Sequence, residues 1–430
     1  MTLWVLRALL SVVLCNGVTR DPTDTRPNVL FVVVDDMGWE DLRELPLTQI
    51  HGALGAARVY PRFYTSPVCS PSRYQMMYGR YAHDALIGKA IDTSNAAEKG
   101  APTEHLCVAE SMSAADYRTA LFGKWHVSGP ATGALGESAR VHGFERWRAG
   151  VPDNLPNIAG AHYDWRRFDD GKQTTEFAYT SIAIEEALRA WWTTTAGPKF
   201  AVCSFIAPHQ PFDLAPSELL GGFTPANNDR GRFESAVVAI DTLFGAILTY
   251  VDTRDTYIFL LADNGTPHQV PPPTPAFSGY KTTVYEGGIN VPLLVWGPDV
   301  LPGEDPSLAQ ICDLPRTVLD LTGTSARREY QASISLAPNL RYGTPGERPW
   351  VFVQRFVPNG GTAPQLSLHR WAVVRADGWK LARHNSFELV LSDLNADPFE
   401  KAPDATQAQP AIAAELLAIF HAALGPNWPY

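Results

Sequence analysis

The chain has 430 residues, of which 45% are hydrophobic and 19% are charged, and its formal net charge is −10 at pH 7. These values are typical of a folded protein with room for a large core and two domains. The negative charge argues against nucleic acid as a partner, because a phosphate backbone requires a basic surface. A small anionic substrate is compatible with it if cations gather at one place.

Residues 1–26 have the pattern of a secretory signal followed by a short tail. Arg7 precedes the apolar run Ala8–Leu14, and small and polar residues follow near Gly17. We expect a secreted or periplasmic protein, with a disordered or packed N-terminal tail as the alternative interpretation. No other run is apolar and long enough to span a bilayer, so we expect no stable membrane insertion.

Four short apolar runs end abruptly at chemically useful residues. The runs are Val29–Val34, Thr119–Phe122, Phe200–Ile206 and Tyr257–Leu261. Continuous apolar runs of this length indicate strands that are buried on both faces. The polar segments that follow them are Asp35-Asp36, Gly123–His126, Ala207–Phe212 and Ala262–Gly265.

Two amphipathic stretches between these runs predict helices that pack against the core. Their apolar positions are Phe177, Ile184, Leu188 and Trp191 in residues 174–192, and Phe233, Val237, Ile240, Phe244 and Leu248 in residues 232–251. Strands that alternate with helices predict an α/β fold, a large and mostly parallel sheet flanked by helices on both faces. Ligands of such sheets bind beyond the carboxyl ends of the strands.

The pattern of predicted strands and helices changes after about Gly323. Residues 348–356, 369–383 and 387–394 resemble short strands of an antiparallel sheet, and a helix is expected over about Ala405–Leu424. We therefore predict a catalytic α/β domain over residues 27–323. Residues 324–430 form a smaller C-terminal α+β subdomain in this prediction, with its antiparallel sheet packed by a helix.

The acidic residues at two predicted strand ends suit a hard divalent cation. Asp35 and Asp36 repel each other unless a cation neutralises them, and Asp263 and Asn264 add two further oxygen ligands. Oxygen donors of this kind are preferred by Ca²⁺ and Mg²⁺. Each motif alone is also typical of a turn or a helix N-cap, so the metal interpretation depends on their pairing.

Five basic or imidazole side chains lie in or near the same polar segments. Each one alone is explained by a surface charge or by a hydrogen-bonded core histidine. As a set they are suited to a tetrahedral oxyanion, which a divalent cation would hold as well. These residues are Arg73, Lys124, His126, His209 and Lys281.

Cys69 lies in the segment "SPVCSPSRYQMMYGRY", just before a predicted helix. We interpret Ser70 as the helix N-cap and Pro71 as the first helical residue, so that the helix dipole faces the cysteine. A thiolate nucleophile is one interpretation of this arrangement. Sulfur is, however, a poor ligand for a hard metal near Asp35 and Asp36.

The segment "CSPSR" resembles the C-x-P-S-R signature of type I sulfatases, which belong to the alkaline phosphatase superfamily. The resemblance extends over nearly the whole chain, because further motifs follow in the order of the family. These motifs are "RPNVLFVVVDDMGWEDL", "GKWHVSG", "APHQPF", "LADNG", "YKTTVYEGGINVPLLVWGP" and "WKLARHNSFELVLSDLNADPFE". One departure is Asn290, where relatives often have arginine.

This resemblance implies hydrolysis of a sulfate monoester to an alcohol and inorganic sulfate. It implies that a formylglycine-generating enzyme converts Cys69 to formylglycine, whose hydrate attacks the sulfur. It also implies that the modified residue binds Ca²⁺, or Mg²⁺ as the alternative, together with Asp35, Asp36, Asp263 and Asn264. The resemblance further implies that Arg73 steadies the modified residue and that Lys124, His209 and Lys281 hold the sulfate. It implies that His126 orients the hydrate and assists the release of sulfate.

Three other functions are compatible with the same residues. The first is a formylglycine-dependent phosphonate monoester or phosphodiester hydrolase, whose substrate is also tetrahedral and anionic. The second is an inactive metal- or glycan-binding protein with an unmodified Cys69. The third is a thiol hydrolase that uses Cys69 with His126 or His209. The sulfate ester itself, whether aryl, sugar or choline-like, stays open, because specificity lies in loops.

Overall fold

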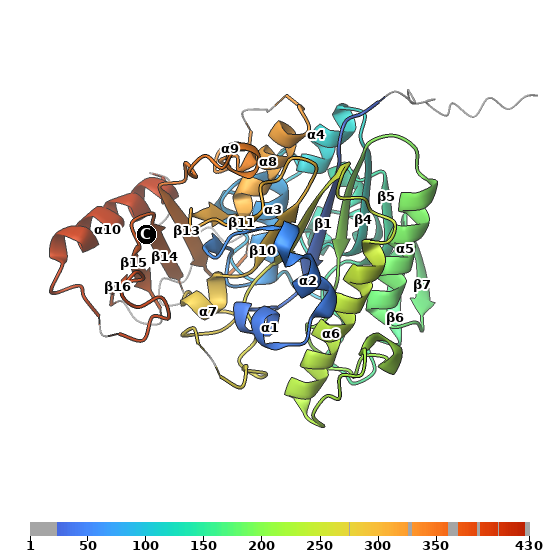
Figure 1. Ribbon diagram of the computed structural model, residues 1–430, viewed down its shortest axis with the longest axis horizontal. Coiled ribbons are helices and arrows are strands. Elements are labelled where there is room, and N and C mark those ends of the chain that lie inside the picture. Colours follow the sequence, from blue (N-terminus) through green and yellow to red (C-terminus); the bar gives the residue numbers. More distant parts are fainter. Residues whose placement is uncertain are drawn as a thin grey trace, which may run out of the picture.

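A computed structural model describes residues 24–274, 276–325, 329–359, 369–384, 388–402 and 404–425 (Figure 1). The predicted signal and tail over residues 1–26 therefore fall mostly outside the described residues. None of the helices in the described ranges combines the length and the apolar character that a bilayer crossing requires.

A ten-stranded sheet forms the centre of the molecule, in the order β11-β2-β10-β9-β1-β8-β4-β5-β6-β7. The strands from β9 to β5 in this order run parallel to one another. β10 and β6 pair antiparallel at the two sides of this parallel block. The bounds are β1 Asn28–Val34, β2 Arg58–Val59, β4 Arg118–Lys124, β5 Arg146–Val151, β6 Trp165–Asp169, β7 Lys172–Glu176, β8 Lys199–Ser204, β9 Thr256–Ala262, β10 Leu293–Trp296 and β11 Gly303–Glu304.

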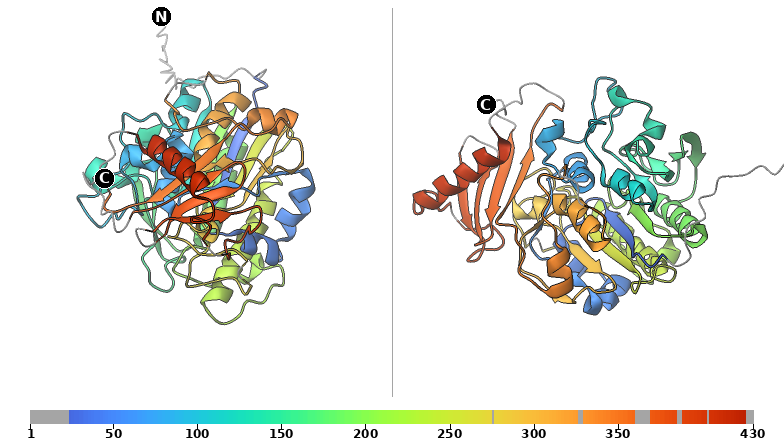
Figure 2. Two further views of the ribbon diagram at one scale, coloured as in Figure 1. Left: turned by 90° about the vertical axis from the view of Figure 1, so that its left-hand side faces the viewer. Right: turned by 90° about the horizontal axis from the view of Figure 1, so that it is seen from above.

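Helices cover both faces of this sheet, as Figures 1 and 2 show. The long helices α5 and α6 pack side by side on one face, and α3, α4 and α8 cover the other. The predicted α/β fold with a mostly parallel, helix-flanked sheet is therefore confirmed. The helices are α1 Trp39–Glu44, α2 Thr48–Ala53, α3 Cys69–Tyr78, α4 Val108–Ala114, α5 Thr180–Thr194, α6 Asp229–Ile247, α7 Glu286–Ile289, α8 Leu314–Leu321, α9 Ala337–Tyr342 and α10 Pro410–Leu424.

The central strand β1 shows why the sheet is buried on both faces. Every residue from Val29 to Val34 is 0% exposed. The ring of Phe31 packs edge-on against Phe200 of β8 and Phe259 of β9, with centroids 5.6 and 5.2 Å apart. Continuous burial of this kind leaves polar side chains only at the strand ends, where function can use them.

The first amphipathic helix begins later than predicted. Residues 172–176 form β7 instead, because Asp170 and Gly171 adopt positive φ angles of 49° and 89° and join β6 to β7 in a hairpin. Phe177 consequently lies outside the helix and is 69% exposed, contrary to the prediction. The second amphipathic helix is α6. Of the five apolar positions named for it, Leu248 alone lies outside the helix bounds, where it is the C-cap residue.

The C-terminal part forms a separate antiparallel sheet in the order β13-β14-β15-β16. Helix α10 packs on its outer face (Figure 2). The ring of Trp371 stacks there on Phe420, with the centroids 3.8 Å apart. The inner face packs its valines and alanines against Val284 and Ile289 of the large domain. The strands are β13 Trp350–Arg355, β14 Arg370–Arg375, β15 Trp379–Arg383 and β16 Val390–Asp393.

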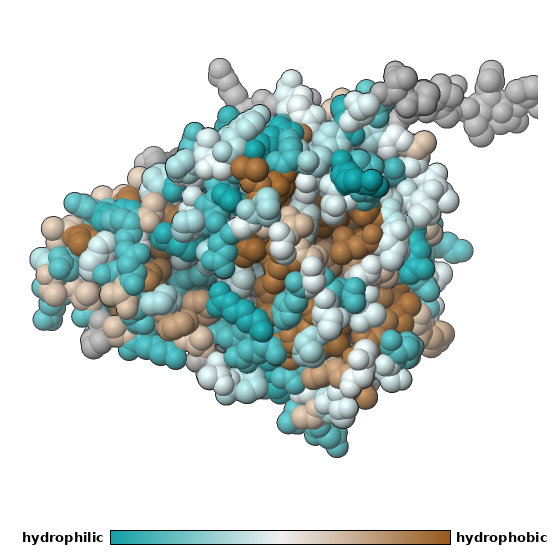
Figure 3. All heavy atoms as spheres, in the orientation of Figure 1, coloured by the Kyte–Doolittle hydropathy of each residue, from teal (hydrophilic) through white to brown (hydrophobic). Residues whose placement is uncertain are grey.

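The first residues after Gly323 still belong to the large core. Tyr330, Leu336 and Leu340 pack in the same apolar cluster as the strands of the ten-stranded sheet. The division at residue 323 stays a prediction. On the face seen in Figure 3, apolar residues gather mainly toward the middle and the lower right, and residues of hydrophilic or intermediate character cover much of the remainder.

Candidate active site

The polar motifs predicted from the sequence converge at the carboxyl ends of the central strands. Asp35 follows β1, Lys124 ends β4, His209 comes after β8 and Asp263 follows β9. All four strands run parallel, so their carboxyl ends meet at one edge of the sheet. Each of these side chains is at most 5% exposed, which makes this edge an unusually charged interior.

The carboxylates at this edge are held by cations of the same chain. Lys124 Nζ donates to Asp35 Oδ2, and Arg73 Nε donates to Asp263 Oδ2 at 2.8 Å. A second Arg73 nitrogen lies 3.6 Å from Asp35 Oδ2. Attraction by Lys124, His209 and Arg73 outweighs burial and lowers the pKa of Asp35 well below its ordinary value.

Asp36 has a different environment from its neighbour. Its backbone adopts a positive φ of 75°, and its carboxylate accepts hydrogen bonds from Lys281 Nζ at 2.8 Å and from Asn264 Nδ2 at 2.6 Å. Burial raises the pKa of Asp36 to about 7. The positive charge of Lys281 opposes this increase, and the negative charges of Asp35 and Asp263 add to it. Crowding of three buried carboxylates therefore disfavours the ionised form of this one.

The chemistry of this cluster fits a hard divalent cation. Asp35, Asp36 and His209 each offer one ligand atom, and these atoms lie within 4.8 Å of one another. Asp35 Oδ1 and Asn264 Oδ1 are buried and have no hydrogen-bond partner among the described residues. Buried oxygens of this kind are costly without a partner, and Ca²⁺ or Mg²⁺ would supply one. The ligand roles of Asp35, Asp36, Asp263 and Asn264 stay predictions.

Arg73 connects the strand ends to helix α3. Besides its carboxylate partners, it donates to Ser204 Oγ at 2.6 Å and to the carbonyl of Lys124 at 3.1 Å. The side chain is 1% exposed, so its charge is balanced entirely inside the protein. Arg73 therefore fixes the position of α3, and of Cys69 at its start, relative to β4, β8 and β9.

Cys69 is itself the first residue of α3, and Val68 is the N-cap. The prediction that Ser70 caps this helix is wrong, because the Ser70 hydroxyl accepts a hydrogen bond from the backbone N–H of Ile91 at 3.0 Å. The helix thus lacks a side-chain cap, and its first turn carries the cysteine directly. Partial positive charge at this terminus favours a negative group at position 69.

His126 is fixed in one orientation next to Cys69. Its Nε2–H donates to the carbonyl of Ile91 at 2.9 Å, which leaves Nδ1 as the acceptor, 3.3 Å from Cys69 Sγ. Burial raises the pKa of the Cys69 thiol, and burial together with Lys124 lowers the pKa of His126 well below its ordinary value. The two side chains therefore meet as a neutral thiol and a neutral imidazole.

His209 and Lys281 complete the set that the sequence singled out. His209 Nδ1–H donates to the carbonyl of Gln210 at 2.7 Å, so its Nε2 faces Asp36 Oδ2 at 3.9 Å. The structure thus brings together all of the predicted site residues. Their individual catalytic and ligand roles stay predictions.

Asn154 belongs to the same site, although the sequence analysis missed it. Its Oδ1 accepts a hydrogen bond from Lys124 Nζ at 2.6 Å. It follows β5, whose apolar stretch ends in "GVPDN", so the signal was the same as for the other strand ends. A cavity of about 680 Å³ opens beside it and is lined by Ala90, Ile91, Asp92, Thr93, Ser94, Leu135, Asp153, Asn154, Leu155, Pro156 and Arg166.

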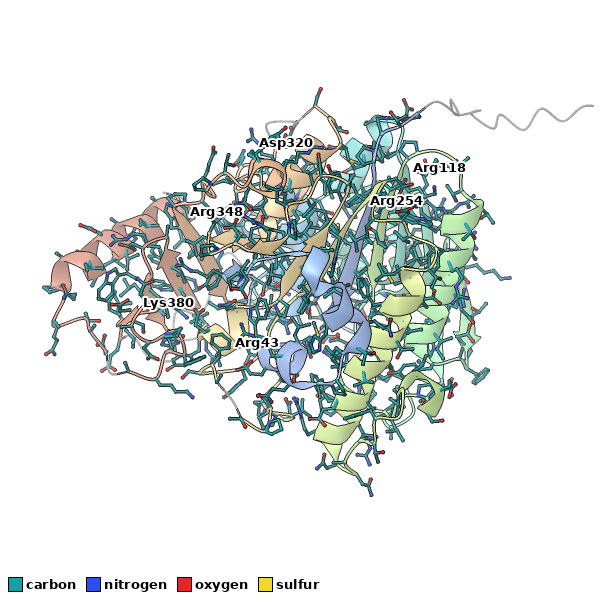
Figure 4. All side chains as sticks on the ribbon, viewed as in Figure 1. Arg43, Arg118, Arg254, Asp320, Arg348 and Lys380 are labelled. Atoms are coloured by element: carbon teal, nitrogen blue, oxygen red, sulfur yellow. The ribbon has the colours of Figure 1, made fainter. Side chains whose placement is uncertain are left out.

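The Asn290 side chain forms its hydrogen bonds in a buried network with Trp39 and Glu286. Its Oδ1 accepts from Trp39 Nε1 at 3.0 Å, and its Nδ2 donates to Glu286 at 2.9 Å. Lys380 of β15 pairs with Glu286 at 3.0 Å and with Glu400 at 2.8 Å, where the small sheet meets α7 (Figure 4). The positive charge opposite Glu286 therefore comes from Lys380.

Comparison with known proteins identifies the family. A family model described as Sulfatase matches residues 27–324. N-acetylgalactosamine-6-sulfatase of Sus scrofa is 29% identical over 463 residues, which cover 96% of this chain and 82% of the relative. Arylsulfatase A of Bos taurus is 27% identical over 352 residues, covering 73% and 68%.

Solved structures agree with this match at the level of the fold. A crystal structure of Ps i-CgsB in complex with k-i-k-neocarrahexaose superposes with a TM-score of 0.80 and 20% identity, and the match covers 92% of each chain. At this identity the likeness concerns the fold alone. Together with the family match over residues 27–324, it leads to one conclusion: the chain belongs to the sulfatase family of the alkaline phosphatase superfamily and is a sulfuric ester hydrolase.

Proposed function

We propose that this protein hydrolyses a sulfate monoester through a formylglycine hydrate made from Cys69. The observation that carries the proposal is the position of Cys69 at the start of α3, 3.3 Å from His126 Nδ1 and under the electrostatic influence of Asp35 and Asp263. The "CSPSR" segment gives this position the signature of the family. A formylglycine-generating enzyme in the source cell would be the maturation partner.

Asp35, Asp36, Asp263 and Asn264 would hold a Ca²⁺ ion, with Mg²⁺ as the alternative. The two buried oxygens without a partner, Asp35 Oδ1 and Asn264 Oδ1, support this assignment. Ca²⁺ is favoured because several of the ligands are anionic and all are oxygens. When bound, such a cation lowers the pKa of a coordinated hydroxyl and withdraws charge from a sulfate oxygen.

The remaining residues act directly on the substrate and on position 69. Lys124 and Lys281 each donate to one of the carboxylates, and His209 Nε2 lies 3.9 Å from Asp36 Oδ2. These groups can therefore hold the sulfate oxygens and balance the charge that develops on them. His209 or Lys281 supports the departing alcohol oxygen as an acid or as a charge partner. His126 Nδ1 faces position 69, where it can accept the proton whose removal releases inorganic sulfate.

We infer that the substrate is a sulfated carbohydrate. N-acetylgalactosamine-6-sulfatase and a carrahexaose-bound structure are among the proteins that this chain resembles. The cavity beside Asn154 has hydroxyl, amide and carboxylate groups in its lining, which suit the hydroxyl groups of a sugar. A secreted or periplasmic location would bring the enzyme to such a substrate.

The proposed modification can be tested by mass spectrometry of the peptide that contains Cys69. We expect an aldehyde in place of the thiol and a hydrate in water. A quantitative thiol at position 69 in protein that turns over sulfate esters would contradict the proposal. Alkylation of thiols gives a second test, because it inactivates a thiol hydrolase but leaves a fully modified sulfatase active.

A formylglycine-dependent phosphonate monoester or phosphodiester hydrolase is the competing activity. The same cations would hold a phosphate ester, because it is also tetrahedral and anionic. Rates on a sulfate monoester and on a phosphate diester with the same leaving group distinguish the two. We expect the sulfate monoester to be the faster substrate, and the reverse order would favour the competing activity.

A further inference from the structure

Two arginines lie directly opposite each other on the inner face of the small sheet. Arg355 of β13 and Arg370 of β14 are register partners. They continue the rows of Val353 and Ala372, which pack toward the large domain. Like charges at directly opposite positions of a sheet are destabilising unless something compensates them.

His384 joins these arginines at the end of β15. Its ring stacks on Tyr285, with the centroids 3.6 Å apart. Arg370 donates to the carbonyl of Thr282 at 2.8 Å, so both contacts reach the same short segment of the large domain. We refer to Arg355, Arg370 and His384 as the basic cluster.

The basic cluster has no acidic partner in the described parts of the chain. Neither Arg355 nor Arg370 forms an ion pair there, and Arg355 Nε and both ring nitrogens of His384 are buried without hydrogen-bond partners. The neighbouring sequence segments 360–368 and 385–387 contain no Asp or Glu. Burial and Arg370 lower the pKa of Arg355, and burial, Lys380 and Arg370 lower that of His384 to about 3.

The adjoining ion pairs show what a purely structural arrangement looks like. Lys380, on the same sheet, lies between Glu286 and Glu400 and is 0% exposed. Its charge is therefore fully compensated within the chain. The basic cluster differs because its charges repel one another, and this is the pattern expected where an external anion supplies the compensation.

The position of the basic cluster connects it to the candidate active site. Thr282, which Arg370 contacts, follows Lys281, and Lys281 Nζ lies 2.8 Å from Asp36 Oδ2. The backbone N–H of Thr282 donates to the carbonyl of Pro67 at 2.7 Å, two residues before Cys69 in the sequence. One hydrogen-bonded segment thus joins Arg370 to the residues that would hold the reacting sulfate.

We propose that Arg355, Arg370 and His384 form a subsite for a second anionic group, a carboxylate or a second sulfate, on the same saccharide as the reacting sulfate ester. This inference rests on the proposed function and specifies its substrate class as a polyanionic saccharide. A pair of guanidinium groups suits either anion, because both offer two or more oxygens to the planar N–H fork. A neutral sulfated sugar would leave the two arginines uncompensated.

The test compares saccharides that differ only in the second group. Initial rates are measured for a monosulfated disaccharide, for the same disaccharide with a second sulfate, and for one with a uronate carboxylate. We expect kcat/KM to be about tenfold or more higher for one of the dianionic substrates. The substrate with the higher value identifies which anion the subsite accepts.

The variants Arg355→Gln and Arg370→Gln should reduce this preference to near unity. A general loss of folding or positioning would instead lower kcat/KM for all substrates and leave their ratio unchanged. Arg375→Gln is the matched control, because Arg375 lies at the other end of β14 and pairs with Asp377 and Glu415 at the surface. Equal kcat/KM for mono- and dianionic substrates, or a preference that persists in both variants, would overturn the subsite.

Binding to the Cys69→Ala protein tests the subsite without turnover. We expect calorimetry to give about tenfold tighter binding of a disulfated or uronate-containing disaccharide than of the monosulfated one, and loss of this difference in Cys69→Ala/Arg370→Gln. Equal affinities would overturn the subsite even if the enzyme is an active sulfatase. Absence of an aldehyde at position 69 would contradict the proposed mechanism while this binding result still decides the subsite.

Discussion

The carboxyl edge of the large sheet buries Arg73 and Lys124, whereas Arg355 and Arg370 on the inner face of the small sheet are partly exposed, and the two regions balance these charges differently. At the sheet edge, Arg73 and Lys124 pair with Asp35 and Asp263 of the same chain. On the small sheet, Arg355 and Arg370 face each other, and neither forms an ion pair with an acidic side chain of the described residues. The first arrangement is assembled by folding, whereas the second leaves charge for a ligand to compensate.

Removal of the reacting group at the sheet edge should have the largest effect. We expect Cys69→Ala to lower kcat by about 10³-fold or more, because the proposed mechanism requires the side chain at position 69 to accept and then release the sulfuryl group. Cys69→Ser should accept one sulfuryl group per molecule without turning over. Circular dichroism and single-turnover kinetics check both variants. Cys203→Ala, a buried cysteine of β8, is the control and should keep its turnover.

Breaking the balance at the sheet edge should strongly destabilise the fold. Arg73→Gln leaves Asp35 and Asp263 buried with too little positive charge, so we expect the free energy of unfolding to fall by about 3–5 kcal/mol. Denaturant unfolding measures the change. Arg118→Gln removes a half-exposed arginine from the start of β4 and should change stability by less than about 1 kcal/mol. Equal effects of the two substitutions would contradict the proposed role of Arg73.

Acid should destabilise the basic cluster through His384. Its folded pKa of about 3 lies below its ordinary value of 6.5, so the unfolded chain binds a proton first as the pH falls. Stability contributed by His384 is therefore present above pH 6.5 and is lost between about pH 6.5 and 3. We expect the unfolding free energy of His384→Phe, which keeps the contact with Tyr285, to fall by about 3 kcal/mol less than that of the wild type between pH 7 and pH 4. An equal loss of unfolding free energy in His384→Phe and in the wild type between pH 7 and pH 4 would contradict this prediction.

A smaller effect is expected from the residue that orients Lys124. Asn154→Ala removes the 2.6 Å hydrogen bond to Lys124 Nζ, so we expect kcat/KM to fall about three- to tenfold. Steady-state kinetics on one sulfate ester measure it. Asn157→Ala, in the same loop but exposed, is the matched control and should be neutral. If both variants have wild-type kcat/KM, Asn154 does not position Lys124.

The smallest effect should have the opposite sign to that of Arg73→Gln. Arg355→Gln relieves the repulsion from Arg370, so we expect the free energy of unfolding to rise by about 0.2–1 kcal/mol. Arg375→Gln, which loses surface ion pairs on the same sheet, should leave stability unchanged or lower it slightly. A loss of several kcal/mol in Arg355→Gln would mean that Arg355 is compensated within the chain, and the contrast between the two regions would disappear.

Much of the site could be predicted from the sequence because buried parallel strands have a simple signature. Runs such as Val29–Val34 are apolar throughout, so the first polar residue after each one marks the edge of the sheet. Asn154 was missed although it follows the same rule, because "RWRAGV" of β5 begins with charged residues. The Ser70 cap was wrong for another reason, since its hydroxyl is used by Ile91, a residue distant in sequence.

The α/β fold, the carboxylates and cations at the strand ends, and the family signature around Cys69 could all be recognised in the order of the residues alone. These features depend on local periodicity and on residues that are close along the chain. The pairing of Arg355 with Arg370, and the lack of an ion pair from either arginine to an acidic side chain of the described residues, became apparent only in the folded structure. Charge balance in an interior is a sum over contacts between distant segments, so it exists only once the chain has folded.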